Sequence, residues 1–142
     1  MDFKLYQAET EKTCLFHEKI LEKAQEAFIN DLELTEMEFQ GVIHSLQVII
    51  ENAIGKAKHL LKYFKLDIPA SAYVTFEYLN IHGIMTKKEL HQWKSIVGLR
   101  NAIVHEYMSV NNDIIIHVVK TREYLFVVSF LKSTFSQFQN PS

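Results

Sequence analysis

A regular apolar stripe between residues 39 and 64 constrains the fold of this chain more than any other feature. Its hydrophobic side chains recur at steps of three and four: Phe39, Ile43, Leu46, Ile50, Ile54, Ala57, Leu61 and Phe64. That spacing is typical of one buried face of an α-helix. Thr35 and Glu38 form a capping box before the stripe, and Asp67-Ile68-Pro69 cannot continue a helix beyond about residue 66. The pattern therefore predicts one long helix.

Three further helices are predicted from capping signals and from the same periodicity. The first covers about residues 8–29, and its apolar side is made by Leu15, Ile20, Leu21, Ala24 and Phe28. Ser71 is expected to cap a short helix that reaches Ile81. Thr86 and Glu89 form a second capping box, which opens another helix.

The last helix is predicted over about residues 113–137. Its β-branched segment, residues 114–119, is also compatible with a strand, but no second strand candidate exists to pair with it. From Tyr124 to Phe138 the helix is apolar nearly all round, which is typical of a helix buried on more than one side. A two-fold homodimer is the simplest explanation in so small a domain. We therefore predict an all-α, antiparallel bundle of about five helices that forms a homodimer.

The composition agrees with a single domain over residues 1–142. Hydrophobic residues make up 48% of the chain and Gly plus Pro only six residues, which favours packed helices over disorder or a turn-rich sandwich. The one cysteine, Cys14, cannot form an internal disulfide and suits a reducing cytosol. The sequence shows neither a secretion signal nor a run of about 20 apolar residues. We expect a cytoplasmic protein without contact to a membrane.

The charge is unevenly distributed along the chain. Residues 1–40 carry four lysines against ten acidic residues, whereas residues 41–142 carry eleven basic against seven acidic ones. The overall net charge of −2 argues against a protein that coats nucleic acid unaided. A nucleic-acid surface is therefore expected on the later helices, and the acidic N-terminal part is expected to point away from it or to serve a partner.

The segment Arg100-Asn101-Ala102-Ile103-Val104-His105-Glu106-Tyr107 holds the candidate chemistry. A guanidinium that is always charged can stabilise a pentavalent phosphate, and an imidazole that titrates near neutral pH can transfer a proton. Together they suffice, without a metal ion, to cleave RNA through its 2′-hydroxyl. One chain offers a single histidine in this segment, whereas a two-fold dimer offers two copies of Arg100 and of His105 to one cleft.

The spacing of these residues resembles the signature of the HEPN superfamily, and the flanking segments 94–99 and 108–119 look like its HepT branch. HepT-like proteins are ribonuclease toxins paired with an MntA-type nucleotidyltransferase antitoxin, in a type VII-like system. The resemblance runs from about residue 39 to residue 125. It implies a dimer-shared cleft that cleaves tRNA or mRNA without a cofactor, with Arg100 and His105 as the catalytic pair and Asn101 in support. It also implies that the antitoxin silences the enzyme by transferring AMP to Tyr107.

Helical geometry limits how one chain can use this pair. Five residues in a straight helix correspond to about 140° around its axis, so Arg100 and His105 would not converge. Either the helix kinks after Arg100, or the two groups meet across the dimer. Glu51, on the long helix, is a candidate to orient Arg100.

Two other interpretations remain open at this stage. The chain could be a non-catalytic helical subunit that binds substrate or nucleotide for a separate nucleotidyltransferase, or a dimeric adaptor in which the motif only packs. The six histidines outside the motif show no zinc-site spacing, and one cysteine cannot complete such a site. His117 and Arg122 follow the motif closely and are candidates to line the same cleft.

Overall fold

The computed structural model describes residues 1–105 and 111–140, and the regular secondary structure of this part is all helical. The elements are α1 (Phe3–Ile29), α2 (Glu36–Tyr63), α3 (Ala72–Ile81), α4 (Lys87–Val104), α5 (Asn112–Lys120), α6 (Tyr124–Lys132) and a 3₁₀ turn, η1 (Phe135–Gln137). No strand occurs among these residues, so the all-α prediction is confirmed. None of the described helices is long and apolar enough to cross a membrane.

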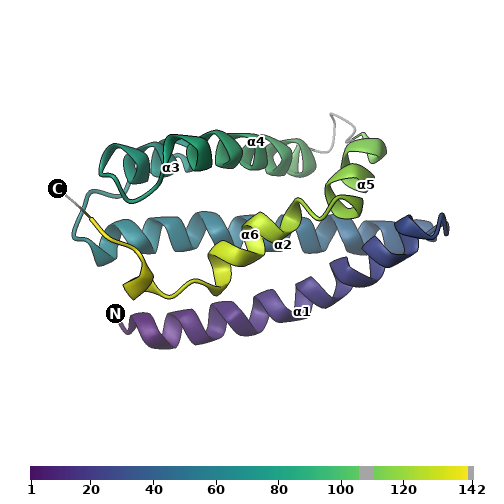
Figure 1. Ribbon diagram of the computed structural model, residues 1–142, viewed down its shortest axis with the longest axis horizontal. Coiled ribbons are helices and arrows are strands. Elements are labelled where there is room, and N and C mark those ends of the chain that lie inside the picture. Colours follow the sequence, from purple (N-terminus) through teal and green to yellow (C-terminus); the bar gives the residue numbers. More distant parts are fainter. Residues whose placement is uncertain (106–110, 141–142) are drawn as a thin grey trace.

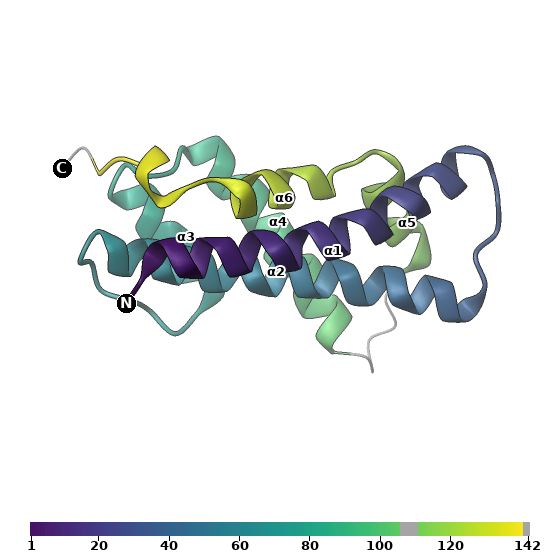
Figure 2. The same ribbon diagram turned by 90° about the horizontal axis from the view of Figure 1, so that it is seen from below.

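Helix α2 lies at the centre of the bundle (Figure 1). Helix α1 runs antiparallel to it on one side, and α3 and α4 pack on the other side. Helix α6 lies along both α1 and α2, while α5 packs on the C-terminal part of α1 (Figure 2). The core therefore has α2 at its middle, and α4, which carries the candidate motif, is anchored on it.

The predicted helix starts are confirmed by their capping hydrogen bonds. The Thr35 hydroxyl accepts from the amide of Glu38 at 3.1 Å, and the Glu38 carboxylate accepts from the amide of Thr35 at 2.8 Å. Thr86 and Glu89 make the same reciprocal pair at the start of α4. Helix α1 begins earlier than predicted because the Asp2 carboxylate caps two amides of its first turn.

The prediction of one continuous last helix over residues 113–137 is wrong. The chain breaks at residues 121–123, where Arg122 adopts a left-handed backbone conformation with φ of 62°. The Thr121 hydroxyl donates to the carbonyl of His117 at 2.7 Å at the end of α5. A threonine hydroxyl that bonds a backbone carbonyl in this way competes with the regular backbone hydrogen bonds of a helix. The break lets α6 follow α1 and α2, and it places Arg122 at the corner between α5 and α6.

The buried face of α1 also differs from the prediction. Leu15 was assigned to the apolar side, yet its side chain is 48% exposed. The face packed on the bundle mixes polar with apolar residues: Gln7, Thr10, Cys14, His17, Glu18, Leu21, Ala24, Gln25 and Phe28. The polar members have partners, for example His17 with the Ser45 hydroxyl at 3.0 Å. Apolar periodicity cannot find such a face, because half of it is not apolar.

Helix α6 is covered by its own chain. Its buried residues are Tyr124, Val127, Val128, Phe130 and Leu131, and they pack on α1 and α2. On α4, the Trp93 ring lies 4.9 Å from the Phe126 ring and 5.0 Å from the Phe130 ring, measured between centroids. The apolar character of this helix is therefore explained within one chain, and it gives no separate support for a dimer.

A fully buried lysine holds the end of α6. The Lys56 ammonium, 0% exposed, donates to the carbonyls of Phe130 at 2.6 Å, Leu131 at 3.2 Å and Ser133. These carbonyls belong to the C-terminal end of the helix, where a positive charge is favoured by the helix dipole. Burial nevertheless lowers the pKa of Lys56 from 10.5 to about 8. Its position on α2 gives no sign in the sequence that it is buried.

Candidate active site on helix α4

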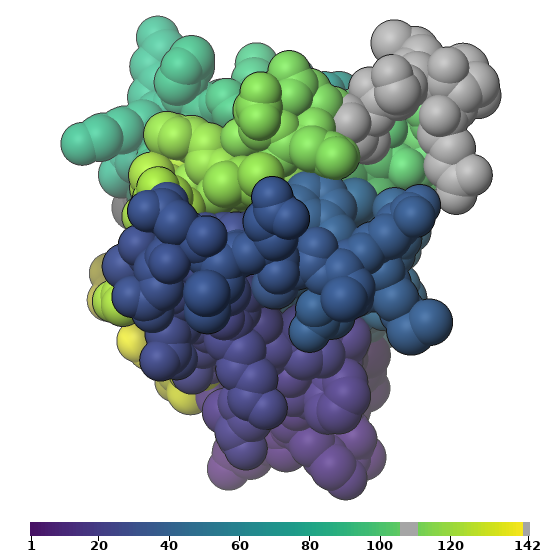
Figure 3. Space-filling model, turned by 90° about the vertical axis from the view of Figure 1, so that its right-hand side faces the viewer, coloured from purple at the N-terminus to yellow at the C-terminus, as the bar shows by residue number. Residues whose placement is uncertain are grey.

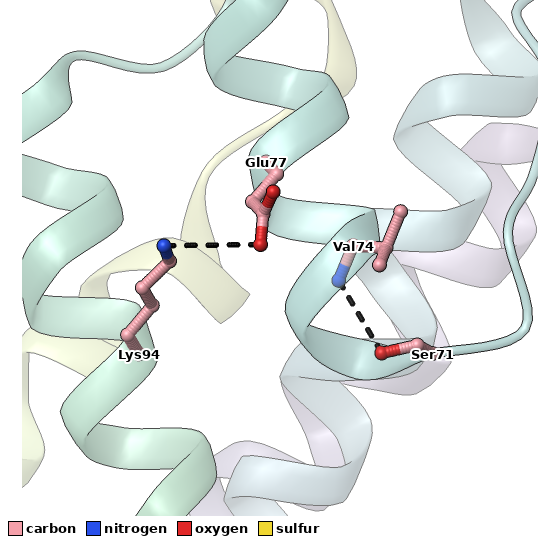
Figure 4. A network of polar contacts seen from close by, with 4 residues as sticks. All are labelled: Ser71, Val74, Glu77 and Lys94. Carbon is pink, nitrogen blue, oxygen red and sulfur yellow. Dashed lines mark hydrogen bonds and ion pairs between the residues drawn. The ribbon is translucent and has the colours of Figure 1, made fainter.

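Helix α4 is fixed firmly along most of its length. Trp93 and Val97 are buried, and the Trp93 ring stacks on the Phe76 ring of α3 at 4.5 Å between centroids. Lys94 forms an ion pair with Glu77 of α3 at 3.7 Å, close to the Ser71 cap that starts α3 (Figure 4). This exposed pair contributes on the order of 0.5 kcal/mol at most to stability, but it partly neutralises one of the lysines of this helix.

Arg100 lies on the inward stripe, as the sequence predicts, one step beyond Trp93 and Val97. Its side chain is half-buried, and its enclosed Nε atom has no hydrogen-bond partner among residues 1–105 and 111–140. A buried donor without a partner costs about 1–3 kcal/mol, so native proteins seldom retain one. The permanent charge of the guanidinium favours an anion beside this end of α4, but the enclosed Nε itself is reached by a phosphate or carboxylate oxygen only after neighbouring side chains move.

His105 is the C-cap residue of α4. Its amide donates to the carbonyl of Asn101 at 3.1 Å, so helical hydrogen bonding persists through this residue, and its side chain is exposed. The kink after Arg100 that would bring the two side chains together in one chain is therefore not present. The second predicted arrangement, in which these groups meet across a dimer, stays a prediction.

The other predicted site residues lie in different situations. Asn101 is half-buried, one residue after Arg100. Glu51 is exposed, and its carboxylate accepts from the Gln47 amide at 2.9 Å. Over the described part of the chain no ion pair joins Glu51 to Arg100. Tyr107 lies outside the described residues. No three His, Cys, Asp or Glu side chains gather as a metal site within residues 1–105 and 111–140.

A groove of about 500 Å³ lies beside the motif, between α4 and the α5–α6 pair. Its floor is formed by Leu46, Ile49 and Ile50 of α2, and its α4 wall includes Ser95, Ile96 and Leu99. His117 and Arg122 line this groove, whereas Arg100 and His105 do not. Within one chain the groove therefore does not join these two residues to the motif pair, and their sharing of a dimer cleft with Arg100 and His105 stays a prediction. Figure 3 looks onto this end of the bundle, where α5 lies beside the connection between α1 and α2.

The family model for HepT-like ribonucleases matches residues 16–133, which include the whole of α2, α4 and the intervening α3. The chain belongs to the HepT-like ribonuclease family. An mRNA nuclease of Shewanella oneidensis, HepT, is 38% identical to it over 80 residues. That match covers 56% of this chain and 60% of the relative.

Two solved structures have the same fold as this HepT-like chain over nearly its whole length. One is a tri-AMPylated Shewanella oneidensis HEPN toxin in complex with an MNT antitoxin, 28% identical, with a TM-score of 0.72; the match covers 92% of this chain and 95% of the other. The second is a toxin–antitoxin complex with AMP-PNP, 27% identical, with a TM-score of 0.70 over 93% and 99% of the two chains. The HEPN-like fold predicted from the sequence is thereby confirmed, with six described α-helices in place of about five.

Proposed function

We propose that this HepT-like chain is a metal-independent endoribonuclease, the toxin of a pair whose antitoxin is an MNT-type nucleotidyltransferase. The observation that supports it best is the half-buried Arg100, whose Nε has no partner in the described part of the chain, near the end of a helix whose C-cap is His105. The similar proteins support the same reading, since one is an mRNA nuclease and another is a HEPN toxin bound to an MNT antitoxin. We place the protein in the cytoplasm, where it would meet its RNA substrate.

The proposed reaction is a transesterification within the RNA. One His105 imidazole takes the proton of a 2′-hydroxyl, and that oxygen attacks the adjacent phosphorus. Arg100 stabilises the charge of the phosphorane. The bond from phosphorus to the 5′-oxygen then breaks, and a second His105, as imidazolium, protonates the leaving oxygen. The products are a 2′,3′-cyclic phosphate and a free 5′-hydroxyl.

This scheme requires a two-fold homodimer, because each chain supplies only one His105. Since α4 has no kink, the guanidinium of one chain and the imidazole of the other must approach each other across the two-fold axis. Asn101, half-buried beside Arg100, is proposed to support the site by holding a phosphate oxygen or the neighbouring imidazole. Glu51 is exposed, and no ion pair in the described part of the chain joins it to Arg100, so it has no step in the scheme.

The purified wild-type protein is expected to cleave single-stranded RNA in the presence of excess EDTA. Cleavage should leave 2′,3′-cyclic phosphate ends, which are detected by end-group analysis of the fragments. If the wild type cleaved no RNA but bound nucleotides through Arg100, the chain would instead be a binding subunit of a nucleotidyltransferase. Loss of cleavage in EDTA with recovery on adding Mg²⁺ would contradict the metal-independent mechanism.

AMPylation of Tyr107 is the proposed means of silencing the enzyme. Adenylate attached two residues from His105 would place a phosphate near Arg100 and obstruct the cleft. Co-expression with the neighbouring nucleotidyltransferase is expected to increase the intact mass of the chain by one or more adenylate units and to abolish cleavage. Both effects should be absent in Tyr107→Phe, with Tyr78→Phe as the matched control. An unchanged adenylate gain in Tyr107→Phe would place the acceptor elsewhere.

A further inference from the structure

The groove between α4 and the α5–α6 pair takes no part in the proposed cleavage. Its volume of about 500 Å³ lies within the range of pockets that bind small organic ligands. The floor and walls are apolar, and they include the half-buried Phe126 ring and the side chains of Ile96 and Leu99. Polar side chains line only the rim. Such a groove is suited to a flat, weakly polar group whose polar end remains at the edge.

The rim carries groups that bind phosphates and base edges. Arg122 holds the one guanidinium among the lining residues, and it is steadied at 3.4 Å by the Gln25 side chain of α1. His117, His91, Gln92 and Ser95 add hydrogen-bonding groups. The single carboxylate of the lining, Glu123, lies 3.5 Å from the His117 imidazole, which offsets its charge when that imidazole is protonated. The rim is thus compatible with an anionic ligand.

The groove is continuous with the helix that carries Arg100. Two residues of the α4 wall lie close to Arg100 along the helix. Leu99 immediately precedes Arg100, and Ser95 lies five residues before Arg100, which is about 7.5 Å along the helix axis. That separation is within the reach of one nucleotide. Around the axis of α4, Leu99 and Arg100 are about 100° apart. An RNA strand that passes around this side of the helix would therefore meet first the groove and then Arg100.

We infer that this groove binds the base of an unpaired nucleotide adjoining the scissile phosphate, with Arg122 and His117 on that nucleotide's phosphate. Proteins recognise single-stranded RNA by splaying out bases into apolar and aromatic surroundings, while basic groups follow the backbone. The inference rests on the proposed ribonuclease function and specifies its substrate as unpaired RNA. The alternative occupants are an amphipathic helix of a partner or a second copy of this chain, and both are distinguished below.

The test uses the full chain with His105→Ala, which binds RNA without cutting it. Fluorescence anisotropy measures the Kd of short single-stranded RNAs that carry one abasic nucleotide at successive positions. One position is expected to weaken binding about tenfold, because a stacked base contributes on that order. Ser95→Trp, added to this variant, fills the groove from an exposed position. It should raise the Kd of the RNA without an abasic nucleotide by a similar factor, and the abasic RNA should then bind no more weakly than the intact one.

Arg122→Gln should weaken RNA binding and reduce its dependence on salt, whereas Lys120→Gln removes the same charge two residues away and should have little effect. The inference is overturned if no abasic position matters, or if Ser95→Trp leaves RNA binding unchanged. Loss of the dimer or of the antitoxin complex in Ser95→Trp, measured by size exclusion, would assign the groove to a protein. Cleavage by the wild type is measured separately, so that a failure of the proposed function can be distinguished from a failure of this inference.

Discussion

Replacing His105 with alanine is expected to lower the rate of RNA cleavage by about 10³-fold or more, because each general acid or base contributes ~10²–10⁴ and the variant dimer lacks both. Folding should be unaffected, since the side chain is exposed at the C-cap of α4. Single-turnover cleavage and the thermal midpoint measure these two effects. His44→Ala, an exposed histidine on α2, is the matched control and should cleave normally.

Arg100 variants separate catalysis from packing at the same site. Arg100→Met retains much of the side chain's length but removes the enclosed Nε that has no partner. Removing an unsatisfied buried donor relieves a cost of about 1–3 kcal/mol, so stability should stay constant or rise, while cleavage falls by ~10²–10³-fold. A substantial loss of stability with cleavage retained would identify the motif as a packing element of an adaptor.

A mixed dimer tests whether the cleft is shared. Wild-type chains are combined with chains that carry both Arg100→Met and His105→Ala. If the cleft needs the imidazoles of both chains, the mixed dimer lacks one proton-transfer group, and its cleavage should fall by ~10²-fold or more. Mixed dimers that keep about half the wild-type activity would argue that each chain uses its own pair.

Much of the fold follows from local signals in the sequence. Two capping boxes, one apolar stripe and the Asp67-Ile68-Pro69 stop locate α2, α4 and the turns around α3 to within a few residues. The break at Arg122 could not be foreseen in this way, because a left-handed residue is normally expected at glycine or asparagine. Its cause is tertiary: α6 has to align with α1 and α2, which no local pattern encodes.

The site was predictable in part. Arg100 lies on the inward side of α4, as predicted, because it extends the Trp93–Val97 stripe. The absence of a kink after Arg100 agrees with a straight helix, while the relation of Arg100 to His105 stays a prediction. The groove was missed, although Gln92, Ser95, Ile96 and Leu99 recur at steps of three and four and form a second face of α4. A stripe that contains two polar residues gives little signal until the helices that complete the groove are known.

Lys56 shows most clearly what the sequence could not reveal, because a lysine inside an apolar stripe is ordinarily expected to reach solvent. Here its ammonium is enclosed between the α6 carbonyls and the rings of Phe130 and Phe135, at 5.2 and 5.7 Å from their centroids. Gln7 of α1 adds a hydrogen bond to the Leu131 carbonyl at 2.8 Å. The buried charge thus joins α2 to the C-terminal end of α6, and Gln7 joins the N-terminal half of α1 to one of the same carbonyls.

This burial makes stability depend on pH in a defined window. The pKa of Lys56 is about 8 in the folded chain and 10.5 in the unfolded chain, so between these values the unfolded state binds more protons. The free energy of unfolding contributed by this residue must therefore rise with pH across the window and stay constant below it. Relative to Lys56→Met, the wild type should gain about 3 kcal/mol from pH 7.5 to 10.5.

Urea unfolding of the wild type and of Lys56→Met at a series of pH values measures this difference, and taking the difference cancels the titration of tyrosines common to both. Lys62→Met, an exposed lysine on the same helix, should show no such change relative to the wild type. A flat difference for Lys56→Met across the window would mean that its amine titrates as it does in water. Since three carbonyl acceptors at a helix C-terminus stabilise the charged ammonium, that result would show that they offset the cost of burial and that the pKa of Lys56 is not lowered.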